Sequence, residues 1–297
     1  MKITGLTKLA GAGALALYTT VSAHAGSVAQ PGLTDGIATG TPLAPGWYFL
    51  DTFDWGVRST SPNRSHLGVN APLVAWSTPW MFLGARVQFL AAIPEAQTGT
   101  FGTATNGGSF QAGLFNPLLA GQLAWDIGHT GLGFSYQFGT FFGIDSPVAD
   151  PETSFTNQFA LSYTRDGWNL TAAATIGTQA TANPVFGDYF NIDLTATKRF
   201  GKWEIGMVGF GSTDTTLAVG QTARQSQFAL GGLVGYDFGP VILQAYATRD
   251  VAQSNQTGFS LQSGFDTRLW GRIIIPFLDP PPGGVAPTTL SPGIIRK

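Results

Sequence analysis

Residues 155–177 read FTNQFALSYTRDGWNLTAAATIG, two alternating runs that are joined by the short turn Arg165-Asp166-Gly167. Every second residue from Trp168 to Ile176 is apolar, and the residues between them are polar or small. A period of two is the pattern of a β-strand, and the length of each run suits a strand that crosses a bilayer at a tilt. The stretch therefore predicts a β-hairpin of membrane-crossing length.

The same pattern recurs along most of the chain and predicts an all-β fold. The candidate strands are 46–58, 67–77, 81–94, 115–127, 131–142, 154–164, 168–178, 188–198, 203–213, 226–238, 241–250 and 264–277. Short connections are predicted at 78–80, 128–130, 165–167, 199–202 and 239–240, and long ones at 59–66, 95–114, 143–153, 179–187, 214–225 and 251–263. Strict alternation of short turns and long loops is typical of outer-membrane barrels. We expect a membrane-spanning antiparallel up-and-down β-barrel of about 12 strands, with short periplasmic turns and long extracellular loops.

The composition agrees with a barrel whose outer wall faces lipid. Only 11% of the residues are charged, whereas the chain contains 40 Gly, 22 Phe and 8 Trp. Soluble domains usually carry about 25% charged residues. A net charge of −2 gives no basic face for a nucleic acid, and the absence of Cys removes disulfides and thiolate metal sites.

The two ends of the chain differ from the predicted barrel. Residues 1–25 have a basic start, an apolar segment and the A-x-A site Ala23-His24-Ala25, which predict a cleaved signal peptide. We expect residues 26–45 to be a periplasmic lead-in, 46–277 to be the barrel, and 278–297 to be a Pro/Gly-rich tail. The predicted location is the outer membrane of a Gram-negative bacterium. The expected partners are outer-membrane lipid, a small hydrophobic solute, and the barrel assembly machinery, which would receive a last strand ending at Phe277.

Charged and amide side chains within the strands are candidates for the lumen, because charges are costly on a lipid-facing wall. By alternation, the inward-pointing residues are Arg86, Gln88, Asp193, Asp266, Arg268 and Arg272. Two interpretations remain open at this point. The residues form ion pairs that fill and brace a narrow interior, or they set the electrostatics of a pore.

Aromatic residues near the long loops are candidates for contact with a hydrophobic solute. They are Phe101, Phe110, Phe115 and Phe141. The alternative is that these rings belong to the upper aromatic girdle of the barrel.

Short motifs in the predicted strands resemble those of a known family. Residues 45–50, PGWYFL, resemble its opening PPGxYxxN strand, and residues 167–171, GWNLT, resemble its Gly-Trp-x-Leu-Ser hairpin. Further matches lie at 79–86, 187–193, 202–210 and 231–239, although Phe210 replaces a Tyr and Leu233 replaces a Pro. The family is labelled MetA-pathway of phenol degradation, or SphA-like transporters. The resemblance covers residues 44–277 and implies an outer-membrane barrel for the uptake of aromatic or other hydrophobic compounds.

A search for catalytic chemistry gives little. The sequence has no P-loop and no dinucleotide fingerprint, and its three His residues have no metal-ligand spacing. We expect no catalytic, cofactor-binding or metal site. The first hypothesis is a passive channel for small hydrophobic or aromatic compounds. The alternatives are a non-conducting structural or adaptor barrel with a filled lumen, and a barrel enzyme built on His66 with Ser59, Ser61 or Asp54.

Overall fold

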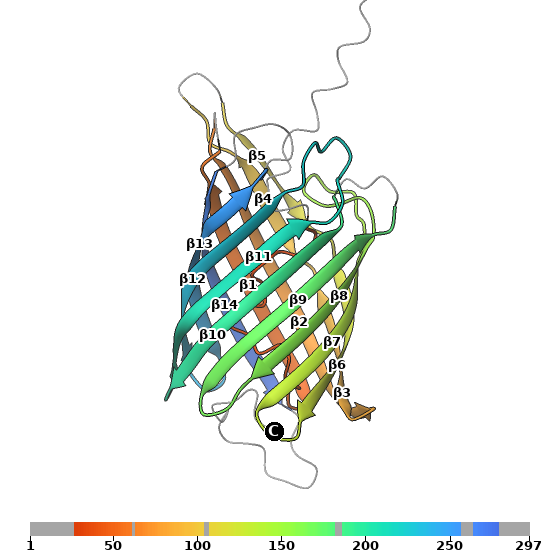
Figure 1. Cartoon of the computed structure of the whole chain (residues 1–297), viewed down its shortest axis with the longest axis vertical. Helices are drawn as coiled ribbons and strands as arrows, with labels where there is room; N and C mark the ends of the chain where they lie inside the picture. Colours follow the sequence, from red (N-terminus) through yellow and green to blue (C-terminus); the bar gives the residue numbers. More distant parts are fainter. Residues whose placement is uncertain (1–26, 61–62, 104–106, 182–185, 257–263, 279–297) are drawn as a thin grey trace, which may run out of the picture.

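The structure is a closed antiparallel β-barrel, which confirms the fold predicted from the alternating runs (Figure 1). It is a computed structural model that describes residues 27–60, 63–103, 107–181, 186–256 and 264–278. The predicted signal peptide and nearly all of the predicted tail lie outside the described residues. Within these residues no helix is long and apolar enough to span a membrane.

In the described part of the chain, fourteen strand segments build a wall that is twelve strands around. The segments are β1 (Gly46–Arg58), β2 (Ser65–Phe82), β3 (Ala85–Ala92), β4 (Glu95–Thr100), β5 (Ser109–Leu114), β6 (Leu118–Ile127), β7 (Leu132–Phe141), β8 (Ser154–Tyr163), β9 (Trp168–Gln179), β10 (Tyr189–Phe200), β11 (Trp203–Asp214), β12 (Ser226–Asp237), β13 (Ile242–Ser254) and β14 (Asp266–Leu278). β3 and β4 both pair with β2, and they also pair with β6 and β5 respectively. β3 and β4 together therefore occupy one strand position, and β5 and β6 together occupy the next one.

The interruptions at Pro94 and Pro117 divide these two strands, because proline has no N–H to give to the sheet. The prediction of a long loop at 95–114 is wrong. Most of this stretch forms the hairpin of β4 and β5, and the connection runs only from Thr100 to Ser109. This stretch is rich in Gln, Thr and Gly, which is the composition of a loop. In the structure its side chains nevertheless alternate between the two faces of a wall that continues past the proline interruptions.

The first short turn also differs from the prediction. Residues 78–80 lie inside β2, where the register with β3 shifts between Ser77 and Met81. The turn itself is formed by Leu83 and Gly84, with φ angles of 49° and 78°. Pro79 gave the signal of a turn, but it occupies a bulge, another place where a missing N–H is tolerated.

The hairpin of β8 and β9 shows which way the alternating faces point. On β9 the side chains of Trp168, Leu170 and Ile176 are 40%, 42% and 43% exposed, and they face outward. Asn169 and Thr171, which alternate with them, are buried in the interior. The same arrangement on β7 and β10–β13 gives the barrel an apolar outer wall, as expected for a wall in contact with lipid.

The barrel closes by pairing its first strand with its last. β1 pairs with β14 from Gly46↔Leu278 to Arg58↔Asp266, and with β2 on its other side. Closure gives every segment of the described wall a partner on both sides except β5, which pairs with β4 alone. The backbone groups of the closed part can therefore be satisfied within the barrel.

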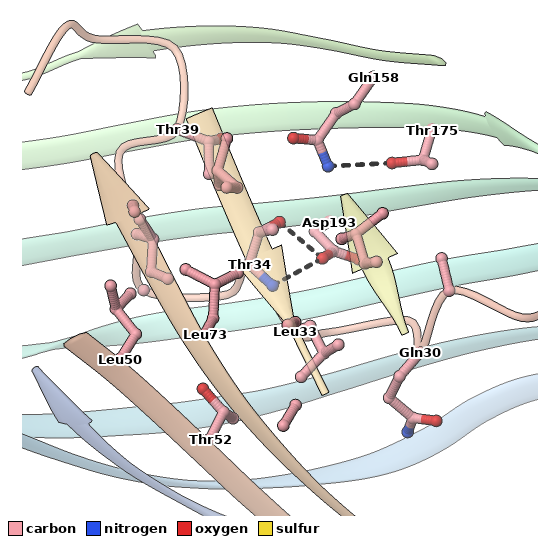
Figure 2. A pocket seen from close by; sticks show the side chains of 18 of the residues that line it. Gln30, Leu33, Thr34, Thr39, Leu50, Thr52, Leu73, Gln158, Thr175 and Asp193 are labelled. Atoms are coloured by element: carbon pink, nitrogen blue, oxygen red, sulfur yellow. Dashed lines mark hydrogen bonds between the residues drawn. The ribbon is translucent and has the colours of Figure 1, made fainter. Parts of the chain in front are cut away.

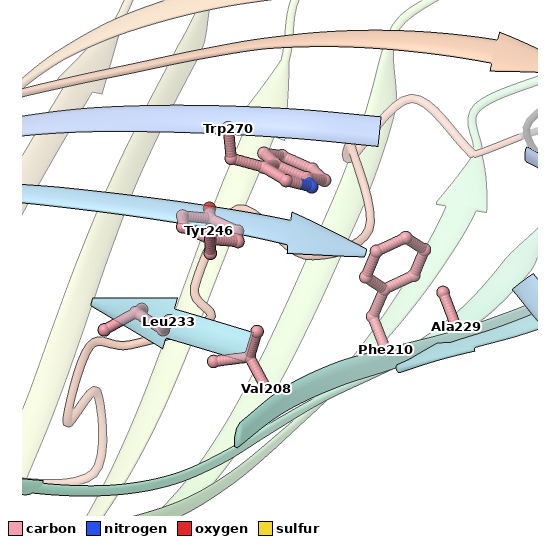
Figure 3. Close-up of a cluster of buried hydrophobic side chains, with 6 residues drawn as sticks. All are labelled: Val208, Phe210, Ala229, Leu233, Tyr246 and Trp270. Carbon is pink, nitrogen blue, oxygen red and sulfur yellow. The ribbon is translucent and has the colours of Figure 1, made fainter. Parts of the chain in front are cut away.

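The periplasmic position predicted for residues 26–45 is wrong for the described part of this segment, which precedes β1. Residues 27–44, here called the plug, run through the interior of the barrel. Asp35 and Ala38 in this segment are fully buried. Leu33 packs on an interior apolar cluster formed by Val208, Phe210, Ala229, Leu233, Tyr246 and Trp270 (Figure 3). The Gly- and Pro-rich plug has no period of its own, which explains why the sequence read as an exposed leader.

Candidate functional site

Asp193 on β10 holds the first turn of the plug. Its buried carboxylate accepts hydrogen bonds from the backbone N–H of Gly32 at 2.9 Å, and from the N–H and hydroxyl of Thr34 at 3.0 and 2.7 Å. Gly32 has a φ of 87°, and a Cβ here would lie 2.7 Å from the Phe210 ring. The turn therefore needs glycine at this position and a carboxylate opposite it.

Arg272 on β14 holds the same turn from another side. Its Nη2 donates to the carbonyl of Leu33 at 2.6 Å, and its Nη1 donates to the carbonyl of Asp35. Its Nε donates to the hydroxyl of Thr52 at 2.8 Å, which fixes the guanidinium against β1. One turn of the plug is thus fastened by a carboxylate that accepts from its N–H groups and a guanidinium that donates to its carbonyls.

The periplasmic end of the plug is fastened by uncharged groups. Gln88 accepts a hydrogen bond from the N–H of Leu43 at 3.1 Å, and Ser162 accepts one from the N–H of Gly40 at 2.9 Å. A Cβ on Gly40 would lie 2.6 Å from the backbone nitrogen of Ser162, so the plug touches the wall backbone here. Arg86, also predicted to point inward, donates to the carbonyl of Thr78 at 2.9 Å and makes no hydrogen bond to the described residues of the plug.

Asp266 and Arg268 belong to a buried ionic cluster near the extracellular end. Arg268 pairs with Asp266 at 2.9 Å and with Asp54, while Arg58 pairs with Asp250 at 3.1 Å. The side chains of these groups are at most 7% exposed. Such contacts match the bracing interpretation at this position, because the charges neutralise one another across β1, β13 and β14.

A cavity of about 340 Å³ lies between the plug and the wall. Its wall on β1–β3 is apolar and includes Leu50, Leu67, Val69, Leu73 and Leu90. Figure 2 shows Leu50 and Leu73 beside the plug, with Gln158 and Thr175 on the other side. The cavity lining extends to Val148 and Phe186 at the end with the long loops and to Arg199 at the end with the short turns, so the space runs along the barrel.

The lumen-facing side of β2 is apolar. Leu67, Val69 and Leu73 point inward, whereas Asn70 and His66 point outward. The orientation of β2 is set by its register with β1 and β4, which the hydrophobic pattern of β2 alone does not reveal.

The four candidate phenylalanines divide into two groups. Phe115 and Phe141 line the cavity near its extracellular end and join Phe186, Tyr189 and Val28 in one apolar cluster. Phe101 and Phe110 lie on the outer wall instead, with ring centroids 5.1 and 6.2 Å from that of His66. The loop position predicted for Phe110 is wrong, because this residue belongs to β5.

His66 is not placed for the proposed catalytic group. Its ring stacks on Trp55 at 4.9 Å on the outer wall, whereas Asp54 faces the lumen and pairs with Arg268. Among the described residues no group of three or more His, Asp or Glu side chains could hold a metal ion.

Sequence reasoning missed the plug and most of the residues that hold it. Thr195 accepts a hydrogen bond from the N–H of Gly36 at 2.7 Å, and Gln244 donates to the Gly36 carbonyl at 3.2 Å. These partners are more than 150 residues apart in the sequence. A signal was present in the inward positions of β8–β10, whose Ser, Thr and Ala residues leave space inside, but nothing in the pattern indicated what would fill it.

Comparison with known proteins gives a family and a fold. Residues 51–261 match the family model described as "Putative MetA-pathway of phenol degradation". The fold is similar to the COG4313 outer membrane channel from Pseudomonas putida F1, with a TM-score of 0.64 and 11% identity, covering 84% of this chain and 100% of that chain. The β domain of the Bordetella autotransporter BrkA gives a TM-score of 0.45 and 14% identity, covering 77% of this chain and 98% of that chain. No curated protein matches the sequence.

Proposed function

Because the chain belongs to the MetA-pathway phenol-degradation family, we propose that it is an outer-membrane channel for the passive uptake of small hydrophobic or aromatic compounds. The observation that carries this proposal is the apolar cavity between the plug and the β1–β3 wall. Solutes pass through this space, and the plug narrows it.

Small apolar solutes gain free energy when they leave water for an apolar surface, at roughly 25 cal/mol per Å² removed from water. A lumen lined throughout by charges would offer them no such gain. The inward leucines of β1–β3 do offer it, and a cavity of about 150 Å³ already accommodates benzene. The volume of about 340 Å³ is therefore sufficient for a single-ring compound.

The setting of this function is the outer membrane. We propose that the chain is exported by a signal peptide that is cleaved after Ala25, and that the assembly machinery recognises a last strand ending at Phe277. The outward apolar side chains then contact lipid. Passive passage requires no cofactor and no catalytic residue.

A second candidate function is a structural or adaptor barrel whose lumen does not conduct. The observation that favours it is the extent of internal contact: Asp193 and Arg272 hold the plug, and the Arg58–Asp250 and Arg268–Asp266 pairs brace the extracellular end. The two candidates differ on whether the cavity carries a solute.

Blocking the cavity tests the proposal. Leu73→Trp adds a large side chain to the apolar wall, whereas Val74→Trp adds the same group at the next residue, which is 41% exposed on the outer face. We expect Leu73→Trp to lower the initial uptake rate of a labelled aromatic compound at least fivefold in Gram-negative cells with intact lipopolysaccharide, and Val74→Trp to leave it unchanged. Cells without the protein supply the background.

Equal uptake by cells with and without the protein, together with no conductance in planar bilayers, would favour the non-conducting barrel. Heat-modifiable gel migration verifies that each variant has folded as a barrel.

A further inference from the structure

A continuous row of uncharged polar side chains winds around the inside of the barrel. Its members are direct cross-strand partners, so they share the interior face. In order they are Ser77, Gln88, Gln122, Gln137, Gln158, Thr175, Asn191, Ser212 and Gln227. Because the strands of a barrel are tilted, a row that follows the cross-strand pairs climbs from one end of the barrel toward the other. This set is called the polar row below.

The two ends of the polar row bind the plug. Near the periplasmic end Gln88 accepts from the N–H of Leu43 at 3.1 Å, and Gln122 donates to the carbonyl of Thr39 at 3.1 Å. Near the other end Asn191 donates to the hydroxyl of Ser27 at 2.8 Å. These amide groups have a structural use, because they satisfy buried polar groups of the plug.

The middle of the row faces the cavity and has no plug partner. Gln137 and Gln158 both line the cavity. Gln158 donates its Nε2 to the hydroxyl of Thr175 at 3.0 Å, which orients the amide, and no described residue donates to its carbonyl oxygen (Figure 2). The Gln137 side chain makes no hydrogen bond to any described residue. Two neighbouring amides thus retain hydrogen-bonding capacity inside the cavity.

The charged groups that line the same cavity are engaged. Asp193 accepts three hydrogen bonds from the plug, and Arg199 pairs with Asp237 at 3.2 Å. An ionised solute would have to give up its hydration without finding a free counter-charge among these groups, which is costly. The lining therefore favours an uncharged solute.

We propose that Gln137 and Gln158 form the polar subsite of the channel, which binds the single hydroxyl or carbonyl group of an uncharged aromatic solute while its ring lies on the leucine wall. This proposal rests on the proposed function and names the class of solute. Each amide offers a carbonyl oxygen that accepts from a hydroxyl and an N–H that donates to an oxygen. A solute with a ring but no hydrogen-bonding group gains only the apolar contact.

The test uses two solutes that differ in one group, 4-methylphenol and 1,4-dimethylbenzene. The double variant Gln137→Leu with Gln158→Leu keeps a similar side-chain volume and removes both amides. Gln97→Leu is the matched control, because its neighbours Ala96 and Thr98 line the cavity and Gln97 therefore faces the outer wall. Initial uptake is measured in Gram-negative cells with intact lipopolysaccharide, and uptake by cells without the protein is subtracted.

We expect the double variant to take up 4-methylphenol at least fivefold more slowly than the wild type, the ratio that about one neutral hydrogen bond supplies. Its uptake of 1,4-dimethylbenzene stays equal or rises, and Gln97→Leu changes neither rate. Unchanged uptake of 4-methylphenol, or an equal loss for both solutes in a folded variant, overturns the subsite and leaves the channel standing. If the wild type takes up neither solute above background, the channel and its subsite both fail.

Discussion

At the scale of single residues, the plug is held by opposite charges that do not pair with each other. Asp193 accepts from the N–H groups of one turn, and Arg272 donates to the carbonyls of the same turn. Each charge is thereby satisfied by backbone dipoles, and hydrogen bonds to charged groups contribute about 1.5–3 kcal/mol. A turn with no secondary structure around it gains a fixed conformation from its surroundings in this way.

A second buried carboxylate, Asp150, gives the loop between β7 and β8 a dependence on pH. Asp150 is fully buried, and its backbone N–H donates to Asn116 Oδ1 at 2.8 Å. Burial raises the pKa of Asp150 from its ordinary value of 3.8 to about 6. The folded loop therefore prefers the protonated form, and its stability falls as the pH rises from about 4 through 6.

We expect the amide of Ile144, which donates to the Asp150 carbonyl at 3.3 Å, to have a higher hydrogen-exchange protection factor at pH 4 than at pH 7.5. Asp150→Asn keeps the shape and removes the titration, so its protection factor should be the same at both pH values. A wild-type loop that is equally protected at the two pH values would contradict the raised pKa.

At the scale of elements, the hairpin of β8 and β9 depends on its turn. The N–H of Trp168 donates to the carbonyl of Arg165 at 3.0 Å, and the central residues Asp166 and Gly167 have φ angles of 56° and 79°. Positive φ at both central positions is the type I′ geometry that suits a two-residue hairpin turn.

Gly167→Val should destabilise the barrel by about 2 kcal/mol or more, because valine resists positive φ and its Cβ would lie 2.9 Å from the carbonyl oxygen of Arg199. Asp166→Asn is the matched control and should change stability by less than about 0.5 kcal/mol, since asparagine tolerates this region. Urea unfolding of the refolded protein, followed by gel mobility, measures both. Equal stability of Gly167→Val and the wild type would contradict the turn assignment.

The sequence was sufficient to predict elements with a clear hydrophobic period. It was insufficient where a neighbouring strand or a distant side chain determines the orientation or the conformation. For the hairpin of β8 and β9, alternation predicts the strands and the outward direction of Trp168, and the structure confirms both. On β2, Leu67 and Val69 face the lumen because β1 and β4 fix the register, which the local pattern of β2 does not reveal. The plug could not be predicted at all, since its fold is imposed by side chains such as Asp193 from distant strands.

At the scale of the whole molecule, the plug and the wall divide the lumen unequally. The turn of the plug at residues 32–36 packs against β10–β14, where the apolar cluster around Trp270 and the partners Asp193 and Arg272 lie. The cavity occupies the remaining space, and its lining comes chiefly from β1–β10, with Gln244 and Ile274 added from β13 and β14. Solutes are therefore expected to pass beside a plug that stays in place.

A disulfide between the plug and the wall tests this expectation, and the native chain has no Cys that would interfere. Thr34 and Asp193 are in side-chain contact, with the hydroxyl and the carboxylate 2.7 Å apart, and loss of free thiols on mild oxidation of Thr34→Cys with Asp193→Cys verifies that the disulfide has formed. We expect the oxidised protein to keep the wild-type uptake rate of an aromatic solute. Uptake that stops on oxidation and returns on reduction would show that the plug must move.

The position of the plug has a further consequence when it is regarded as a tethered ligand. Only Ala44 and Pro45 separate Leu43, which is bound by Gln88, from the first residue of β1. A short tether gives an effective concentration on the order of millimolar or more. A segment whose intrinsic dissociation constant lies well below this concentration then remains bound nearly all the time. Cutting the chain between residues 44 and 45 would convert the same segment into a free peptide, whose occupancy would fall on dilution.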